Sequence, residues 1–336
     1  IVDMVWEDQT PDQIITRAAC DNAAVVAMSM GCSTNAVIHL VAMAKRAGID
    51  FGMEDLDAAS RHVPVIANVR PSGSTYLMED FFYAGGLKGL MSRLTDKLNL
   101  DAMTVSGETW GEALKGAEVY NDDVIRPLDN PLYEHGSLAL LKGNLAPDGC
   151  VIKPSACDPR FNNHEGPALV FDTYPELKAA IDDENLDVTA DHVLVFRGAG
   201  PQGGPGMPEW GMLPIPKKLI KEGVRDMLRM SDARMSGTSY GACILHVAPE
   251  AHIGGPLALL KTGDIVKLDI PNRTIDMLVS EEELVKRRAA WTQPEPKFQR
   301  GYGWMFSKHI KQANEGCDFD FLETDFGAPV GEPDIY

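Results

Sequence analysis

Hydrophobic positions recur at helical spacing through the first third of the chain. Between Pro11 and Met30 apolar residues return every three or four positions, and Thr10 stands where an N-cap would. This pattern predicts one helix over 11–30, with Pro11 in its first turn. Further helices are expected over 36–47 and 53–61, on both sides of Gly85-Gly86, and near 104–114.

A β-branched run, Val63–Val69, predicts one strand among these helices, and after residue 135 short apolar runs divided by turn residues become the rule. These runs predict strands over 138–141, 150–153, 168–171, 192–197, 242–247, 265–269 and 274–278. Helices are expected over 174–181, 216–229 and 281–291. Strands at this spacing favour a closed or nearly closed barrel. We therefore expect an α/β protein, in which residues 1–134 end an α/β domain and residues 135–336 form a mixed β-barrel domain with an acidic tail.

Composition narrows the possible partners. The 336 residues carry a formal net charge of −18, which argues against nucleic acid and anionic membranes, since both attract basic surfaces. No run approaches the roughly 18 apolar residues of a membrane span. Six scattered cysteines show no C-x-x-C spacing, so we expect reduced thiols and a cytoplasmic protein. An acidic small-molecule substrate would need a local positive centre, most simply a metal ion.

Two glycine-rich polar loops stand out from this background. The first, Gly198–Glu209, follows a predicted strand and ends in a single carboxylate. The second, Ser231–Gly241, lies between two apolar runs. Loops of this kind present backbone N–H groups and hydroxyls to a ligand, although an ordinary Gly/Pro turn is the alternative for each.

The amino-acid sequences of these two loops resemble the signatures of a known enzyme family. G-P-x-G-G-P-G-M-x-E and S-D-A-R-M-S-G-T-S are similar to the two C-terminal signatures of the dihydroxyacid and phosphogluconate dehydratases, which remove water from sugar acids and related 2,3-dihydroxy acids. M-G-x-S-T-N at 30–35 also recurs near the active site of that family. The resemblance covers nearly all of this chain and the C-terminal part of the family's sequence. The loop around Ser236 is closest to pentonate dehydratases, L-arabinonate dehydratase especially.

The resemblance implies roles for individual residues. Ser236 would be the base that removes the C2 proton, and Glu209 would be a ligand of Mg²⁺. The residues expected to bind substrate are Thr238, Ser239, Ser33 and Thr34. For Ser33 and Thr34, simple helix capping is the alternative.

Neighbouring charged and imidazole groups are expected to be structural. Asp232 and Arg234 would form a local ion pair, and His39 would be a core histidine with satisfied hydrogen bonds. His246 and His252 are alternative proton carriers, but His246 lies in a strand-like run and is expected to be structural.

Two cofactors follow from the resemblance, Mg²⁺ and an iron–sulfur cluster of the 2Fe–2S type. None of the six cysteines falls in a matching motif, so the cluster ligands would lie outside this chain. Residues 1–134 would then be the C-terminal portion of the cluster-binding domain, and activity would require a missing N-terminal part. The partners expected are a sugar acid and further copies of the chain, as a dimer or tetramer.

Other functions stay open at this point. A branched-chain dihydroxyacid dehydratase is the alternative within the family, and a non-catalytic module that binds sugar acids is the alternative outside it. A third alternative, a chain whose role is oligomerisation, would be favoured if Ser236 and Glu209 lay far apart.

Overall fold

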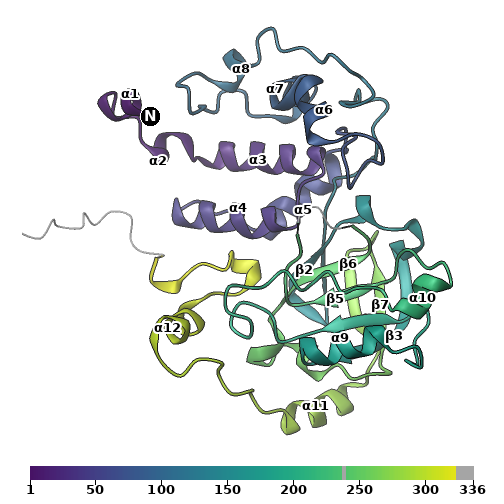
Figure 1. Cartoon of the computed structure of the whole chain (residues 1–336). Coiled ribbons are helices and arrows are strands. Elements are labelled where there is room, and N and C mark those ends of the chain that lie inside the picture. The colour runs from purple at the N-terminus through teal and green to yellow at the C-terminus, as the bar shows by residue number, and fades with distance from the viewer. Residues whose placement is uncertain (237–239, 323–336) are drawn as a thin grey trace, which may run out of the picture.

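Eight strands close into a barrel in the second half of the chain, which confirms the predicted fold class (Figure 1). The computed structural model describes residues 1–236 and 240–322. Around the barrel the order is β1-β2-β6-β5-β4-β3-β7-β8. The strands are β1 (Ala139–Gly143), β2 (Ala146–Ile152), β3 (Asn163–Phe171), β4 (Val193–Phe196), β5 (Arg229–Ser231), β6 (Cys243–Ala248), β7 (Ile265–Asp269) and β8 (Thr274–Met277).

Parallel and antiparallel pairs both occur in the barrel. β1 and β2, like β7 and β8, are antiparallel neighbours, whereas β3, β4, β5 and β6 run parallel to one another. β4 reads Val-Leu-Val-Phe and is buried along its whole length, as expected of a parallel strand covered on both faces. Its Val195 lies in register with Val170 and Met230 on its two neighbours. β1 also pairs with β8, which closes the barrel.

Helices form the first third of the chain and lie above the barrel in Figure 1, where α3 and α4 run side by side. They are α1 (Val2–Trp6), α2 (Pro11–Ile14), α3 (Arg17–Met30), α4 (Asn35–Arg46), α5 (Met53–His62), α6 (Met78–Tyr83), α7 (Gly86–Ser92) and α8 (Trp110–Ala113). Four more accompany the barrel: α9 (Tyr174–Asp182), α10 (Lys217–Lys221), α11 (Glu281–Ala290) and α12 (Gly301–His309). α5 joins the two regions because it packs against both α3 and β1.

The single helix predicted over 11–30 is wrong, because the chain forms two helices there. Ile15 leaves the helical region with φ −82° and ψ 88°. The Thr16 hydroxyl then accepts a hydrogen bond from Ala19 N–H at 3.2 Å and caps α3. Thr10, the predicted cap, makes no side-chain capping bond within the described residues.

Two further predictions need correction. Val63–Val69 is not a continuous strand but a set of isolated bridges, in which Val65 pairs with Tyr133. The helix predicted over 216–229 ends after α10, since Gly223 follows with φ +94°, a conformation that stops a helix. The end of that stretch, Arg229, instead begins β5, and α12 was not predicted at all.

The helices and the barrel share one hydrophobic core. Met28 of α3 and Leu56 of α5 belong to the same buried cluster as Leu140, Val151 and Leu245 of the barrel strands. A second cluster fills the barrel itself. The site described below lies where the helical region meets the barrel.

Other expectations concern the whole chain. Within residues 1–236 and 240–322, no helix is long and apolar enough to cross a membrane. All six cysteines are free thiols, as predicted. Most of the predicted acidic tail, residues 323–336, lies outside the described residues.

Candidate active site

The glycine-rich loop starts directly after β4 and is held by a buried carboxylate. Asp232, which is fully buried after β5, accepts hydrogen bonds from the N–H groups of Gly198, Ala199 and Ala251, each at 3.0 Å. These bonds occupy both oxygens, so the start of the loop is fixed to the end of the neighbouring parallel strand.

A second buried carboxylate holds the middle of the loop. Glu250 accepts hydrogen bonds at 2.8 Å from the N–H groups of Gln202 and Gly203, and from the Gln312 side chain. The loop passes so close that a Cβ on Gly200 would lie 2.6 Å from Glu250 Cβ. Glycine is therefore required at this position for steric reasons.

Burial changes the proton affinity of both carboxylates. It raises the pKa of Asp232 to about 6, and the nearby charge of Glu250 adds to this effect, while the three N–H donors lower it. Burial also raises the pKa of Glu250. Asp232 is thus mostly ionised at neutral pH and protonates near pH 6.

Arg234 joins the two signature loops. Its Nε donates to the carbonyl of Met207 at 2.7 Å, and its own carbonyl accepts from Gly211 N–H at 2.8 Å. Glu209 lies between Met207 and Gly211, and Ser236 follows Arg234 by two residues. The segments that carry Glu209 and Ser236 are therefore hydrogen-bonded to each other near these two residues.

The predicted ion pair between Asp232 and Arg234 is wrong. The Asp232 carboxylate faces backbone N–H groups on the buried side of the loop, while Arg234 turns its guanidinium to the Met207 carbonyl. Backbone N–H groups that are distant in sequence therefore bind the Asp232 carboxylate in place of Arg234.

The third motif meets the serine loop through Asn35. Its Nδ2 donates to the carbonyl of Met235 at 3.0 Å, next to Ser236. The Ser33 hydroxyl accepts a hydrogen bond from Asn35 N–H at 3.2 Å, just before α4, whereas the N-cap residue Thr34 makes no side-chain capping bond within the described residues. Thr34 is buried, and its hydroxyl has no hydrogen-bond partner within the described residues.

The remaining predicted site residues differ in exposure. Glu209 is exposed to solvent and Ser236 is partly buried. Thr238 and Ser239 lie outside the described residues. The segments of Glu209 and Ser236 are linked through the guanidinium and the carbonyl of Arg234.

The two nearby histidines have unlike environments. His39 is exposed on α4 and lines a cavity, so the prediction of a core histidine is wrong. His246 is buried in β6 with φ +57°, and both its ring nitrogens lack a hydrogen-bond partner in the described ranges. Burial lowers the pKa of His246 to about 3, helped by the charges of Arg234 and His39, so the ring is neutral.

Sequence reasoning missed Lys153, which supports the third motif. This buried lysine donates from Nζ to the carbonyl of Gly31 at 2.7 Å, at the C-terminal end of α3. A cation there also suits the helix dipole. Burial lowers the pKa of Lys153. The only sequence signal was a lone lysine at the end of an apolar run.

The residues present do not fit an iron–sulfur cluster, whose ligands are cysteine thiolates. Burial raises the pKa of Cys32 and of Cys243 to about 11, so these thiols stay protonated. In the part of the chain that the structure describes, no three His, Cys, Asp or Glu side chains group as metal ligands. Glu209 offers one exposed carboxylate for Mg²⁺, and a single carboxylate is too few donors for a complete site.

Comparison with known sequences supports the resemblance. A family model described as dihydroxy-acid/6-phosphogluconate dehydratase, C-terminal, matches residues 123–317, and its N-terminal counterpart matches residues 1–113. Because the N-terminal model is matched, the comparisons do not support the expectation that activity requires a missing N-terminal part.

Named relatives include enzymes with different substrates. The chain is 52% identical to a 6-deoxy-6-sulfo-D-gluconate dehydratase of Pseudomonas putida over 339 residues, which covers 100% of the chain and 58% of the relative. It is 46% identical to an L-arabinonate dehydratase of Rhizobium leguminosarum bv. trifolii over 99% of the chain and 58% of that relative. A dihydroxy-acid dehydratase of Carboxydothermus hydrogenoformans is 42% identical over 95% of the chain and 57% of the relative. The chain thus spans well under two thirds of these relatives.

Proposed function

This chain belongs to the dihydroxy-acid/6-phosphogluconate dehydratase family, and on that premise we propose that it dehydrates a sugar acid to the 2-keto-3-deoxy acid. The reaction breaks the C2–H and C3–O bonds and releases water. The enol that remains takes up a proton at C3 and becomes the keto acid. The protein must therefore supply a base at C2 and help hydroxide to leave from C3.

The observation that carries this proposal is the meeting of three motifs at Arg234–Ser236. Arg234 bonds to both sides of Glu209, and Asn35 bonds to the residue before Ser236. A reacting sugar acid placed at this meeting point would reach a hydroxyl, a carboxylate and loop N–H groups together. Such convergence of polar groups at one place is typical of an enzyme site.

Ser236 is the proposed base. A serine hydroxyl is a poor base unless N–H donors or a positive charge stabilise its alkoxide. The glycine-containing loop can supply N–H donors, and the Arg234 guanidinium belongs to the same short segment. Ser33, Thr34, Thr238 and Ser239 are proposed to form hydrogen bonds with the substrate's carboxylate or hydroxyls.

Replacement of Ser236 tests the assignment. Ser236→Ala should bind substrate almost as the parent does, while turnover and exchange of the C2 proton with deuterated solvent fall by roughly 100-fold or more. Ser92→Ala is the matched control, because that hydroxyl donates to the Gly89 carbonyl within α7. If Ser236→Ala still exchanges the C2 proton at the parent rate, another residue is the base.

Glu209 is the proposed ligand of Mg²⁺, although the described residues do not complete the metal's coordination. Glu209→Gln keeps the size of the side chain and removes its charge, so we expect the magnesium affinity to fall roughly tenfold or more. A magnesium titration followed by calorimetry measures this without turnover. An unchanged affinity would exclude Glu209 as a ligand.

L-Arabinonate is the first substrate to test, because the sequence of the serine loop resembles pentonate dehydratases more than it resembles the branched-chain enzyme. 6-Deoxy-6-sulfo-D-gluconate is the second candidate, since the relative named for it is the more similar, at 52% against 46% identity. Detection of 2-keto-3-deoxy product from both acids and from a branched-chain dihydroxy acid would rank the three. Binding without product from any of them would favour a non-catalytic module.

A further inference from the structure

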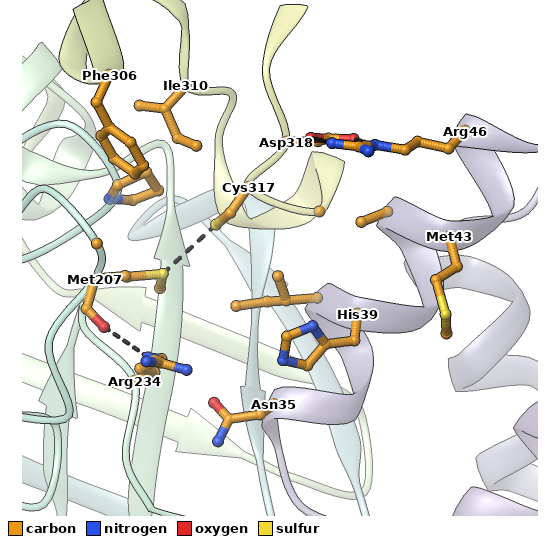
Figure 2. Close-up of a pocket in the computed structure, with 15 residues that line it drawn as sticks. Asn35, His39, Met43, Arg46, Met207, Arg234, Phe306, Ile310, Cys317 and Asp318 are labelled. Carbon is orange, nitrogen blue, oxygen red and sulfur yellow. Dashed lines mark hydrogen bonds and ion pairs between the residues drawn. The ribbon is translucent and has the colours of Figure 1, made fainter. Parts of the chain in front are cut away.

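A cavity of about 600 Å³ lies beside the proposed active site (Figure 2). One wall is α4, with Asn35 and His39, and another is the C-terminal segment that carries Ile310. The two signature loops form the rest, through Met207 and Arg234. The cavity therefore borders the same motifs as Ser236, but the proposed function leaves it unassigned.

The charges of the cavity do not balance. Arg46 is paired with Asp318 by two hydrogen bonds of 2.5 and 2.6 Å, so these two charges cancel. Arg234 lies at the other end of the view in Figure 2, where its Nε donates to the Met207 carbonyl. Within the described ranges no carboxylate pairs with Arg234. An uncompensated guanidinium in a chain of net charge −18 is a specific attraction for an anion.

Polar atoms without partners gather next to Arg234. Asn35 gives its Nδ2 to the Met235 carbonyl, which leaves its buried Oδ1 without a partner in the described part of the chain. The His39 imidazole lies near Arg234 and Asn35 in Figure 2. His246 is buried within electrostatic range of both His39 and Arg234, and its two ring nitrogens are likewise unpartnered among the described residues. Because buried polar atoms are normally hydrogen-bonded, we expect a ligand or ordered water to bind these atoms.

We propose that this cavity binds the anionic group of a polyhydroxylated acid. Arg234 and His39 donate hydrogen bonds to the anionic oxygens, and Asn35 Oδ1 accepts one from a neighbouring hydroxyl. The apolar side chains of Ile38 and Phe306 line the remaining wall and suit a carbon chain. The proposal rests on the proposed function for the class of ligand only, because binding in the cavity requires no turnover.

Calorimetric titration of the whole chain in the presence of EDTA tests the proposal without metal. The ligands are D-gluconate, with one carboxylate, 6-phospho-D-gluconate, with an added phosphate, and the neutral polyol D-glucitol. We expect both acids to bind and D-glucitol not to bind. If 6-phospho-D-gluconate binds clearly more tightly than D-gluconate, the phosphate lies in the cavity. If the two acids bind with equal affinity, the carboxylate lies there.

Variants assign the binding to these residues. Arg234→Gln and His39→Asn should each weaken acid binding, by roughly tenfold or more for Arg234→Gln, since a charged hydrogen bond is lost. Arg234→Lys keeps the charge and should retain part of the affinity, which guards against a folding defect. Lys45→Gln is the control for general electrostatics, because Lys45 lies on the same helix outside the cavity.

The proposal is overturned if neither acid binds at millimolar concentration, if D-glucitol binds as well as the acids, or if Arg234→Gln and His39→Asn bind as the parent does. These outcomes are separate from failure of the proposed function. A chain that binds acids through Arg234 but never yields a keto acid would refute dehydration and leave the cavity assignment intact.

Discussion

Gly200 is a position where the loop of the site has no room for a side chain. An added Cβ would lie 2.6 Å from Glu250 Cβ and 2.7 Å from Oε2 of the same residue. Because three hydrogen bonds fix that carboxylate, it cannot move aside freely. We expect Gly200→Ala to lower the free energy of unfolding by roughly 1–3 kcal/mol, the usual cost of overpacking. Urea denaturation measures the change.

Gly111→Ala is the matched control for this substitution. Gly111 lies in α8, and a Cβ there would have its nearest neighbour at 3.4 Å, an ordinary contact. Alanine also favours a helix over glycine, by up to about 1 kcal/mol. Equal losses at both positions would show that the close approach to Glu250 has no energetic consequence.

His246 predicts a pH dependence of stability. Its pKa is about 3 in the folded chain and 6.5 ordinarily, so between these values the unfolded chain binds the extra proton. Stability from the neutral ring is present above pH 6.5 and is lost as the pH falls, by up to about 1.4 kcal/mol per pH unit. The His246→Gln variant should lack this dependence of the unfolding free energy on pH. Urea denaturation at several pH values between 6.5 and 4 measures it in both proteins.

Two comparisons keep this prediction specific. Asp232 acts with the opposite sign, since its raised pKa makes its contribution fall as the pH rises through about 6, but it is present in both proteins and cancels. His135→Gln removes an exposed imidazole and should leave the slope unchanged. If His246→Gln keeps the parent's slope, the buried ring is not the titrating group.

Single residues were predictable where one local pattern carried the signal. The two glycine-punctuated loops were recognisable because small polar residues stand between apolar runs, and the resemblance then implied the roles of Ser236 and Glu209, which stay predictions. The anchoring roles of Asp232 and Glu250 were not predictable, because the N–H groups that bind these carboxylates lie 19 to 48 residues away along the chain. His39 was misplaced because an apolar helix segment does not reveal which of its faces is left uncovered.

At the level of elements, the two threonines near the start of the chain allow a direct test of capping. Thr16 accepts a hydrogen bond from Ala19 N–H, whereas Thr10 caps nothing with its side chain in the described structure. We expect Thr16→Ala to cost about 1 kcal/mol of unfolding free energy and Thr10→Ala to cost almost none. Thermal or urea denaturation of both variants checks this. Similar losses in the two variants would contradict the assignment of the cap.

The strands and helices with clear boundaries were predictable, and the short or interrupted ones were not. Ile265–Asp269 was predicted with its observed limits as β7 because a turn stands at each end. β5 escaped detection because it has only three residues, Arg-Met-Ser, and is buried through pairing with strands on both sides. Val63–Val69 has the composition of a strand, but its partners are irregular segments that offer single bridges.

For the whole molecule, the distribution of cysteines makes a prediction about metal clusters. Cys20, Cys150 and Cys243 are buried thiols, and no group of three ligand side chains exists in the described residues. After reconstitution of the 336-residue chain with iron and sulfide, we expect no visible cluster absorption to survive desalting. A retained absorption band that disappears on substitution of any of these cysteines would contradict this expectation.

The meeting of the three motifs is a property of the complete fold and was beyond prediction from spacing. Asn35 and Met235 are 200 residues apart in sequence, yet they share a hydrogen bond. The resemblance to a family implied that the motifs belong to one site. The structure adds the physical link, which is a set of hydrogen bonds made by the Arg234 guanidinium, the Arg234 carbonyl and the Asn35 amide.

The hydrophobic cluster that joins Met28 and Leu56 to Leu140, Val151 and Leu245 has a consequence for cooperativity. Neither the helices nor the barrel can lose this cluster without exposing apolar surface on the other. The two regions should therefore melt as one unit and give a single endotherm in calorimetry. A polypeptide cut between residues 134 and 135 would leave each half with an uncovered apolar face, so each expressed alone should aggregate where the intact chain does not.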